Sequence, residues 1–269
     1  MKKIKNLYKD VMRELKENKV SFCVYVILRL LVIITMMRQL FHHNYENVFL
    51  CILTLMLLIL PSFLQVQFHI ELPTLLEIII LLFIFCAEIL GEIESFYLIF
   101  PYWDTMLHTL NGFLAAAIGF SLVDIMNNDE KLQFQLSPMF MAIVAFSFSM
   151  TIGVCWEIFE FLMDCVFQLD MQKDTVVHMI STVSLDSSLQ NIPVIIDNIK
   201  DVTLNGMELN LGGYLDIGLI DTMNDLIVNF VGAFIFSIFG LVYTKNKGKG
   251  YFVKMFIPFH KIIKKKESY

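Results

Sequence analysis

The residues of this chain most able to do chemistry are acidic side chains and one histidine, placed inside three long apolar stretches. Asp104 and His108 are four residues apart, so they share one face of a helix. The other two stretches carry acids and one amide at spacings of three and four residues: Glu157, Glu160, Asp164, Asp221, Asp225 and Asn229. Ionisable groups within membrane spans are costly unless paired, solvated or metal-bound, so these residues are candidates for a functional site.

Carboxylate oxygens with one imidazole form a donor set for Mg²⁺, Mn²⁺ or Zn²⁺. The expected metal ligands are Asp104, His108, Glu157, Asp221 and Asp225. A bound metal activates water, and Glu160 or Asp164 would then act as the catalytic general base. The same residues could relay protons or carry a cation, or they could hold helices together without chemistry. Enzyme, transporter and accessory protein are therefore three open hypotheses.

Membrane-spanning helices are the elements that must position these residues. The chain has 269 residues, 57% of them hydrophobic and 17% charged, whereas soluble domains are about 25% charged. The apolar residues form unbroken blocks, which excludes a β-barrel. Six blocks can each cross a core about 30 Å thick: residues 20–37, 48–64, 75–100, 103–126, 139–166 and 217–243. The predicted fold is an all-α, polytopic membrane helix bundle, with one membrane domain over residues 20–243.

The basic residues set the predicted orientation. Of the 20 Lys and Arg residues, seven precede Val20 and eight follow Tyr243. Both terminal segments, 1–19 and 244–269, are therefore expected in the cytoplasm, and an even number of spans agrees with this. We expect a multi-pass plasma-membrane protein with the lipid bilayer as its partner. Because topology accounts for the basic residues, the net charge of −6 gives no indication of a nucleic-acid partner.

This orientation places all three acidic clusters at the outer ends of their helices. Glu88 and Glu92 near the outer end of the third span would join them in one outward-facing crevice. Arg29, in the middle of the first span, would either pair with Glu88, which we favour, or bind an anionic group that enters the crevice. If the protein is an enzyme, hydrolysis or phosphoryl transfer on a lipid-linked or anionic extracytoplasmic substrate fits best. Inward of Asn111 and Asn229 the spans are almost wholly apolar, which argues against transport.

The connection between the fifth and sixth spans, residues 167–216, is predicted to be a small ordered lid on the outer surface. Within it, Asn205 and Gly206 predict a type I′ turn in a hairpin over residues 202–209. Residues 186–200 are predicted to form a short helix capped by Asp186 or Ser187.

Three motifs, in order, resemble the YjdF-like family of predicted bacterial inner-membrane proteins. They are Trp-Asp-x-x-x-His-x-x-x-Gly at 103–112, Gly-x-x-Trp-Glu-Ile-x-Glu-x-x-x-Asp at 153–164 and Asp-Thr-x-x-Asp-Leu-x-x-Asn-x-x-Gly-Ala at 221–233. The resemblance covers about residues 88–240 and marks these as signature residues: Asp104, His108, Trp156, Glu157, Glu160, Asp164, Asp221 and Asp225. It implies a polytopic protein of the bacterial inner membrane, with no established activity. The extended outer segment departs from the family's pattern, so a shared substrate does not follow.

Overall fold

The computed structural model describes residues 19–68, 70–127, 136–246 and 248–260. Six helical segments in this part of the chain are long and apolar enough to cross a membrane: Lys19–Phe41, Tyr45–Gln67, Thr74–Ile93, Trp103–Asn127, Pro138–Phe167 and Leu219–Lys245. They confirm the predicted fold class, an all-α bundle with six spans. The basic residues before Lys19, on which the predicted orientation partly rests, lie outside the described residues.

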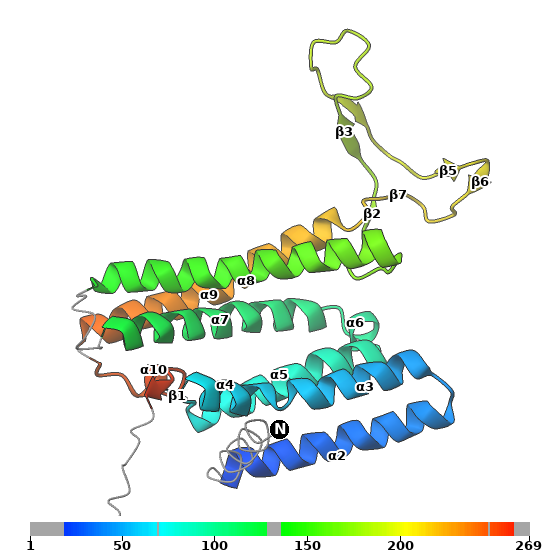
Figure 1. Ribbon diagram of the computed structural model, residues 1–269. Helices are drawn as coiled ribbons and strands as arrows, with labels where there is room; N and C mark the ends of the chain where they lie inside the picture. The colour runs from blue at the N-terminus through cyan, green and yellow to red at the C-terminus, as the bar shows by residue number, and fades with distance from the viewer. Residues whose placement is uncertain (1–18, 69, 128–135, 247, 261–269) are drawn as a thin grey trace, which may run out of the picture. The chain divides into compact units, whose positions relative to one another are not determined.

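Ten helical elements and eight short strands make up the described structure (Figure 1). The helices are α2 (Lys19–Phe41), α3 (Tyr45–Leu57), α4 (Leu60–Phe68), α5 (Thr74–Phe85), the π-helix η1 (Cys86–Ile93), α6 (Phe96–Ile99), α7 (Trp103–Asn127), α8 (Pro138–Phe167), α9 (Leu219–Lys245) and α10 (Tyr251–Lys254). The strands are β1 (Ile70–Glu71), β2 (Val176–Val177), β3 (Ile180–Thr182), β4 (Val194–Ile196), β5 (Thr203–Leu204), β6 (Met207–Glu208), β7 (Tyr214–Leu215) and β8 (Phe259–His260).

The third span ends earlier than predicted. A single helix over residues 75–100 is wrong, because α5 continues into η1 and stops at Ile93. Ser95 then takes a φ of 59°, a left-handed conformation that a right-handed helix does not continue through. Glu88 and Glu92 both lie on the π-helical segment, whose wider turns change the spacing of side chains along its surface.

The chain forms two compact units, and each has its own structure. The first contains residues up to Ile152 together with Val228 onward, and the second is Gly153–Ile227. In the first unit, α2, α3, α5 and η1 enclose one apolar core: Tyr25, Leu28, Val32, Cys51, Leu58, Leu81, Ile89 and Ile93. A second core in the same unit gathers side chains from α5, α7, α8, α9 and α10, including Leu76, Leu114, Phe120, Met141, Phe236 and Phe256.

Within the first unit, α7 and α9 cross at two glycines. A Cβ on Gly112 would overlap the main chain of Asn229, and a Cβ on Gly232 would overlap the main chain of Thr109. The hydroxyl of Ser149 on α8 donates to the carbonyl of Gly112 at 2.7 Å. Small residues let helix backbones approach closely where no water drives their association. The crossing therefore fixes the register of α7 against α9.

The C-terminal segment of the first unit folds back onto the helices. Val253, Phe256 and Ile257 are buried in the second core, and β8 pairs antiparallel with β1. Residues 251–260 thus belong to the packed structure, while the cytoplasmic placement of the segment from 244 onward stays a prediction.

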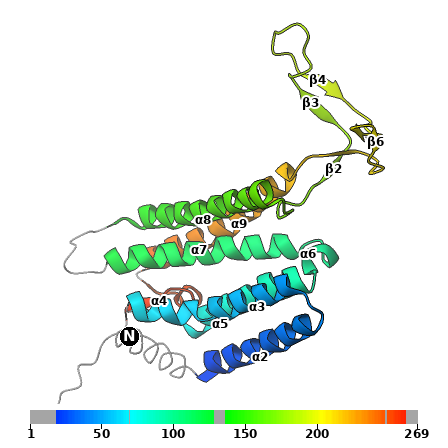
Figure 2. The ribbon, with the colours of Figure 1, turned by 45° about the vertical axis from the view of Figure 1, so that its right-hand side comes forward.

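In the second unit, the segment between α8 and α9 is ordered by short antiparallel strand pairs (Figure 2). They are β2 with β7, β3 with β4, and β5 with β6. The hairpin predicted over residues 202–209 is confirmed, since Asn205 and Gly206 have φ values of 51° and 83°, both positive as a type I′ turn requires. That the segment acts as a lid stays a prediction.

The short helix predicted over residues 186–200 is wrong. The carboxylate of Asp186 instead accepts the backbone N–H groups of Ser188, Gln190 and Ile192. These bonds fold a turn that leads into β4, which pairs with β3. The Ser188 hydroxyl and these backbone bonds hold the pKa of Asp186 at about 2. The aspartate therefore organises a turn, which is the alternative to helix capping that Asp side chains offer.

Candidate functional site

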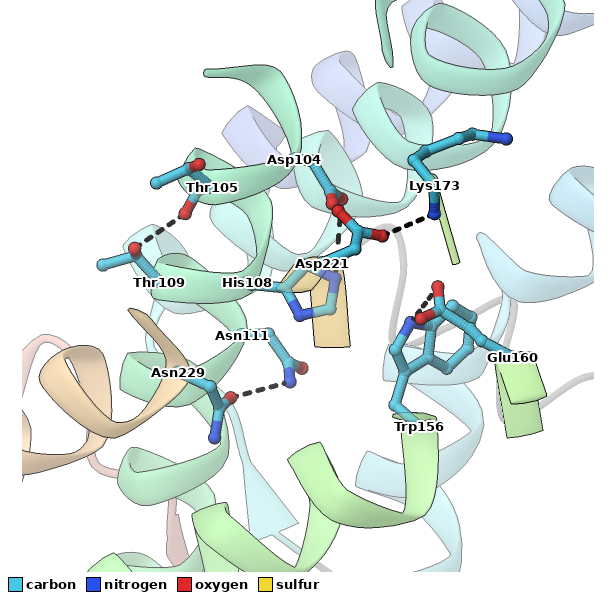
Figure 3. A network of polar contacts seen from close by, with 10 residues as sticks. All are labelled: Asp104, Thr105, His108, Thr109, Asn111, Trp156, Glu160, Lys173, Asp221 and Asn229. Atoms are coloured by element: carbon cyan, nitrogen blue, oxygen red, sulfur yellow. Dashed lines mark hydrogen bonds and ion pairs between the residues drawn. The ribbon is translucent and has the colours of Figure 1, made fainter. Parts of the chain in front are cut away.

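In the first unit, the first turns of α7 place Asp104 beside His108. The His108 Nε2 atom lies 3.5 Å from Asp104 Oδ1 (Figure 3). His108 is only 7% exposed, whereas the side chain of Asp104 keeps about a third of its surface exposed. The separation is longer than the roughly 2.9 Å of an ordinary N–H···O bond. It suits two ligands that share one ion.

One turn further along α7, an amide pair joins α7 to α9 (Figure 3). Asn111 donates its side-chain N–H to Asn229 Oδ1 at 3.2 Å. Asn229 is fully buried, and its own amide nitrogen lies 3.7 Å from the sulfur of Met150. A buried amide is costly unless it is hydrogen-bonded. The pair therefore holds the two helices in register next to His108.

Asp225 lies one turn before Asn229 on the unbroken helix α9, so the two residues share a face. Asp225 is 4% exposed. Asp104, His108 and Asp225 form a group of three candidate metal ligands, with one ligand atom from each lying within 4.8 Å of the others. No second group of three or more such side chains meets that spacing in the described part of the chain.

In the second unit, α8 contributes two buried carboxylates three residues apart, on one helix face. Glu157 is 5% exposed and Glu160 is 8% exposed. The indole N–H of Trp156 donates to Glu160 Oε1 at 2.9 Å (Figure 3). Glu157 was expected among the metal ligands, but it does not belong to the group of three.

Asp164 holds the backbone that follows α8. Its Oδ1 accepts the N–H of Met171 at 2.6 Å, and its Oδ2 accepts the N–H of Gln172 at 2.9 Å. Both carboxylate oxygens are therefore engaged by main-chain groups. We call residues 171–175 the latch, because this short stretch is fastened to both helices of the second unit.

Asp221, an expected metal ligand, fastens the latch to α9. It accepts the backbone N–H of Lys173 at 2.8 Å (Figure 3). Like Glu157, it lies outside the group of three. Of the five ligands expected from the sequence, the structure thus brings together Asp104, His108 and Asp225.

Gln172 is a site residue that the sequence does not reveal. Its side chain is buried, and its Nε2 donates to the Thr222 hydroxyl at 2.5 Å and to the carbonyl of Glu157 at 3.5 Å. It therefore bridges α8 and α9 one turn before Asp225. Gly218 is the sequence feature that relates to the position of Gln172, because a Cβ at Gly218 would overlap the Gln172 side chain.

Asp216 completes the fastening of the latch. It accepts the N–H of Thr175 at 2.7 Å and the N–H of Ile220, at the start of α9, at 2.8 Å. Burial acts to raise the pKa of Asp216, but backbone bonds from Thr175, Ile220 and Gly218 outweigh it and hold the pKa below its ordinary value. An Asp just before a helix is a recognisable capping signal, and it was available in the sequence.

Arg29 differs from expectation. It donates to the Tyr25 hydroxyl at 2.5 Å, with its guanidinium carbon 5.3 Å from the centre of the Tyr25 ring. Among the described residues Arg29 forms no ion pair with Glu88, so the predicted pair is wrong. The ion pair that forms in this region joins Arg38 of α2 to Glu94, the residue after η1.

The six spans and the largely buried Asp–His–Asp group, with Asp104 partly exposed, define a polytopic membrane protein with a candidate metal centre. Residues 23–246 match the family described as "Predicted membrane protein (DUF2238)", and the chain belongs to this family. The match confirms the expected membership in a membrane-protein family whose description assigns no activity, while the YjdF-like name stays a prediction. No curated protein and no solved structure matches the chain.

Proposed function

We propose that this protein is a metal-dependent membrane hydrolase in which Asp104, His108 and Asp225 hold a divalent ion. The observation that carries the proposal is the group itself, three ligand atoms within 4.8 Å of one another. Three protein ligands leave a coordination position for water, as catalytic metal sites do. The imidazole favours Zn²⁺ or Mn²⁺ over Mg²⁺, which prefers oxygen ligands.

The metal would supply a water molecule of lowered pKa. Of the two expected bases, Glu160 is proposed to accept the proton of that water. Both carboxylate oxygens of Asp164 already accept backbone N–H groups of the latch. In a hydrolysis Glu160 would then hold the proton taken from water and would deliver it to the leaving group when the substrate bond breaks. The Trp156 N–H bond to Glu160 Oε1 fixes the orientation of this base.

The proposed site faces outward from a bacterial plasma membrane, with both termini in the cytoplasm. The seven basic residues before Val20 and the eight after Tyr243 support this orientation. The substrate is then extracytoplasmic or lipid-linked. In a variant without native cysteines, Asn205→Cys should react with an impermeant thiol reagent in intact cells. A correctly inserted protein that stays unlabelled would place the site on the cytoplasmic side.

Transport by the same carboxylates has less support, because aromatic side chains fill the α7–α9 interface beyond the Asn111–Asn229 pair. The Phe113 ring packs edge-on to Phe236 at 5.0 Å and to Phe256 at 5.1 Å, centre to centre. An ion path needs polar groups along its length, and this stretch of the first unit offers aromatic carbon.

The metal content of purified full-length protein tests the proposal. After supplementation with Mg²⁺, Mn²⁺ or Zn²⁺ we expect a stoichiometric ion, with affinity at least about tenfold weaker in Asp225→Ala. Asp164→Asn is the matched control, because it removes a carboxylate charge on α8 while leaving the group of three intact. Absence of bound metal under all three conditions would exclude the metal centre.

A further inference from the structure

The segment that follows α9 in the first unit is rich in lysine. Residues 244–266 contain eight Lys and no Asp or Glu. Lys245, Lys249 and Lys254 lie in the described part of this segment, and all three are exposed. None of the three forms an ion pair within the described residues. Their ammonium groups are therefore available to an anion outside the protein.

The acids of the neighbouring elements lie deeper than these lysines. Glu77 of α5 is 5% exposed, and the side-chain N–H of Gln65 donates to it at 3.3 Å. Glu71 of β1 and Asp124 of α7 are partly buried. Positive charge therefore dominates the exposed surface at this end of the first unit.

The short helix α10 holds this surface beside the membrane spans. Val253 of α10 is buried in the second core, and the Phe252 ring lies 5.4 Å from the Phe239 ring of α9, centre to centre. Phe239 precedes Lys245, the last residue of α9, by six positions, which is about 9 Å along the helix. α10 thus packs along the final turns of a span instead of extending away from it.

The side of α10 that the core leaves open combines aromatic and basic side chains. Tyr251 is 85% exposed, Phe252 is 49% exposed, and Lys254 is exposed. Aromatic rings of this kind are typical of the boundary between hydrocarbon and headgroups, where lysine stems lie along apolar surface and the ammonium stays in the polar layer. Because α10 lies along the end of a span, lipid is the phase that meets these rings.

We propose that α10 and its flanking lysines, Lys245, Lys249 and Lys254, form a binding surface for the headgroups of anionic phospholipids. The charge of the surface is complementary to these headgroups, and each lysine near an anionic membrane surface favours binding about fivefold. The exposed aromatic rings set the depth of α10, so the ammonium groups lie level with the lipid phosphates. The surface is independent of the proposed metal centre and of the side of the membrane that the segment occupies.

The test measures which lipid surrounds this surface in full-length protein. In a variant without native cysteines, Asn246→Cys carries a fluorescent label beside Lys245, at an exposed position. The protein is reconstituted into vesicles of phosphatidylcholine and phosphatidylglycerol in equal amounts, and one lipid or the other is brominated so that it quenches the label on contact. We expect brominated phosphatidylglycerol to quench more strongly, with a local enrichment of at least about threefold. Equal quenching by the two lipids would overturn the proposal.

A charge-neutral variant tests whether the described lysines cause the enrichment. Lys245→Gln, Lys249→Gln and Lys254→Gln together remove exposed charges and leave the buried side of α10 unaltered, so the enrichment should fall at least about twofold. Lys200→Gln removes an exposed lysine from the second unit and should have no effect. An enrichment that the triple variant leaves unchanged would show that this surface does not select the lipid.

Salt provides a second measurement that needs no substitution of a lysine. Added NaCl screens exposed charges, so it should lower the enrichment around the label in the otherwise unaltered protein. An enrichment that is insensitive to salt would contradict binding through the exposed ammonium groups.

Discussion

Asn111 of α7 donates its side-chain amide to Asn229 of α9 at 3.2 Å, and this pair lies one turn beyond His108 and Asp225 on their respective helices. The two side chains proposed to bind the metal are thus each one helical turn from the same hydrogen bond. Because Asn229 is fully buried, water cannot replace that bond. The geometry of the proposed centre therefore depends on an uncharged pair that is not itself a ligand.

A double-mutant cycle on this pair should reveal the coupling. We expect Asn111→Ala and Asn229→Ala each to destabilise the protein, and the double variant to lose less than the sum, by about 0.6–1.7 kcal/mol, the range for hydrogen bonds between membrane helices. Unfolding in mixed micelles measures the free energies. Strictly additive losses would mean that the bond contributes nothing to holding α7 on α9.

Two asparagine variants distinguish the proposed metal ligands, which need a charge, from the latch residues, which need a hydrogen-bond acceptor. Asp225→Asn removes the charge of a proposed ligand and should weaken Zn²⁺ or Mn²⁺ binding at least about tenfold. Asp221→Asn keeps an oxygen that can accept the Lys173 N–H, so metal affinity should stay within about twofold. Isothermal titration calorimetry on both purified variants decides the matter. An equal loss of metal affinity in the two variants would show that Asp221 is also a metal ligand.

The spans and the three residues of the candidate metal group could be read from the sequence because both leave a strong physical signature. Unbroken apolar blocks are needed to cross lipid, and a carboxylate inside such a block is expensive enough to stand out. Asp104, His108 and Asp225 were therefore identifiable without a structure. Glu157 and Asp221 carry the same signature, yet helical spacing alone does not show which carboxylates reach one point.

The features missed in the sequence depend on contacts between distant segments or on competing local bonds. The third span ends at Ile93 where Gly91 lies against the Tyr97 ring, a contact that hydropathy does not encode. Gln172 is a neutral residue in a connection, so it carries no desolvation signal before its partners are known. Asp186 suits a helix cap and an Asx turn equally well, and only the pairing of β4 with β3 decides between them.

Removing the Asp164 carboxylate should expose backbone N–H groups of the latch to hydrogen exchange. Asp164→Ala leaves the N–H groups of Met171 and Gln172 without the carboxylate, so their hydrogen exchange should accelerate by at least about tenfold. Asp164→Asn keeps one carbonyl oxygen as an acceptor and should retain much of the protection. Exchange measured by mass spectrometry on peptides spanning residues 169–176 reports this directly. Unchanged exchange in Asp164→Ala would show that other contacts hold the latch.

Asp174 gives the latch a dependence on pH. Burial, together with the negative charges of Asp170, Asp216 and Asp164, raises the pKa of Asp174 above its ordinary value. The fold therefore favours the protonated form, and the stabilisation this form provides is lost as pH rises through the raised pKa. Asp174→Asn mimics the protonated state.

At pH 7 we expect Asp174→Asn to slow hydrogen exchange at Thr175, whose N–H is bonded to Asp216, relative to the unaltered protein. The ratio between the two proteins should approach one as pH falls to about 3, below the ordinary pKa of an Asp carboxyl, because Asp174 is then mostly protonated in both the folded and the unfolded chain. The measurement is hydrogen exchange of peptides spanning residues 169–176, followed by mass spectrometry across that pH range. A ratio that stays constant with pH would mean that repulsion at Asp174 does not strain the latch.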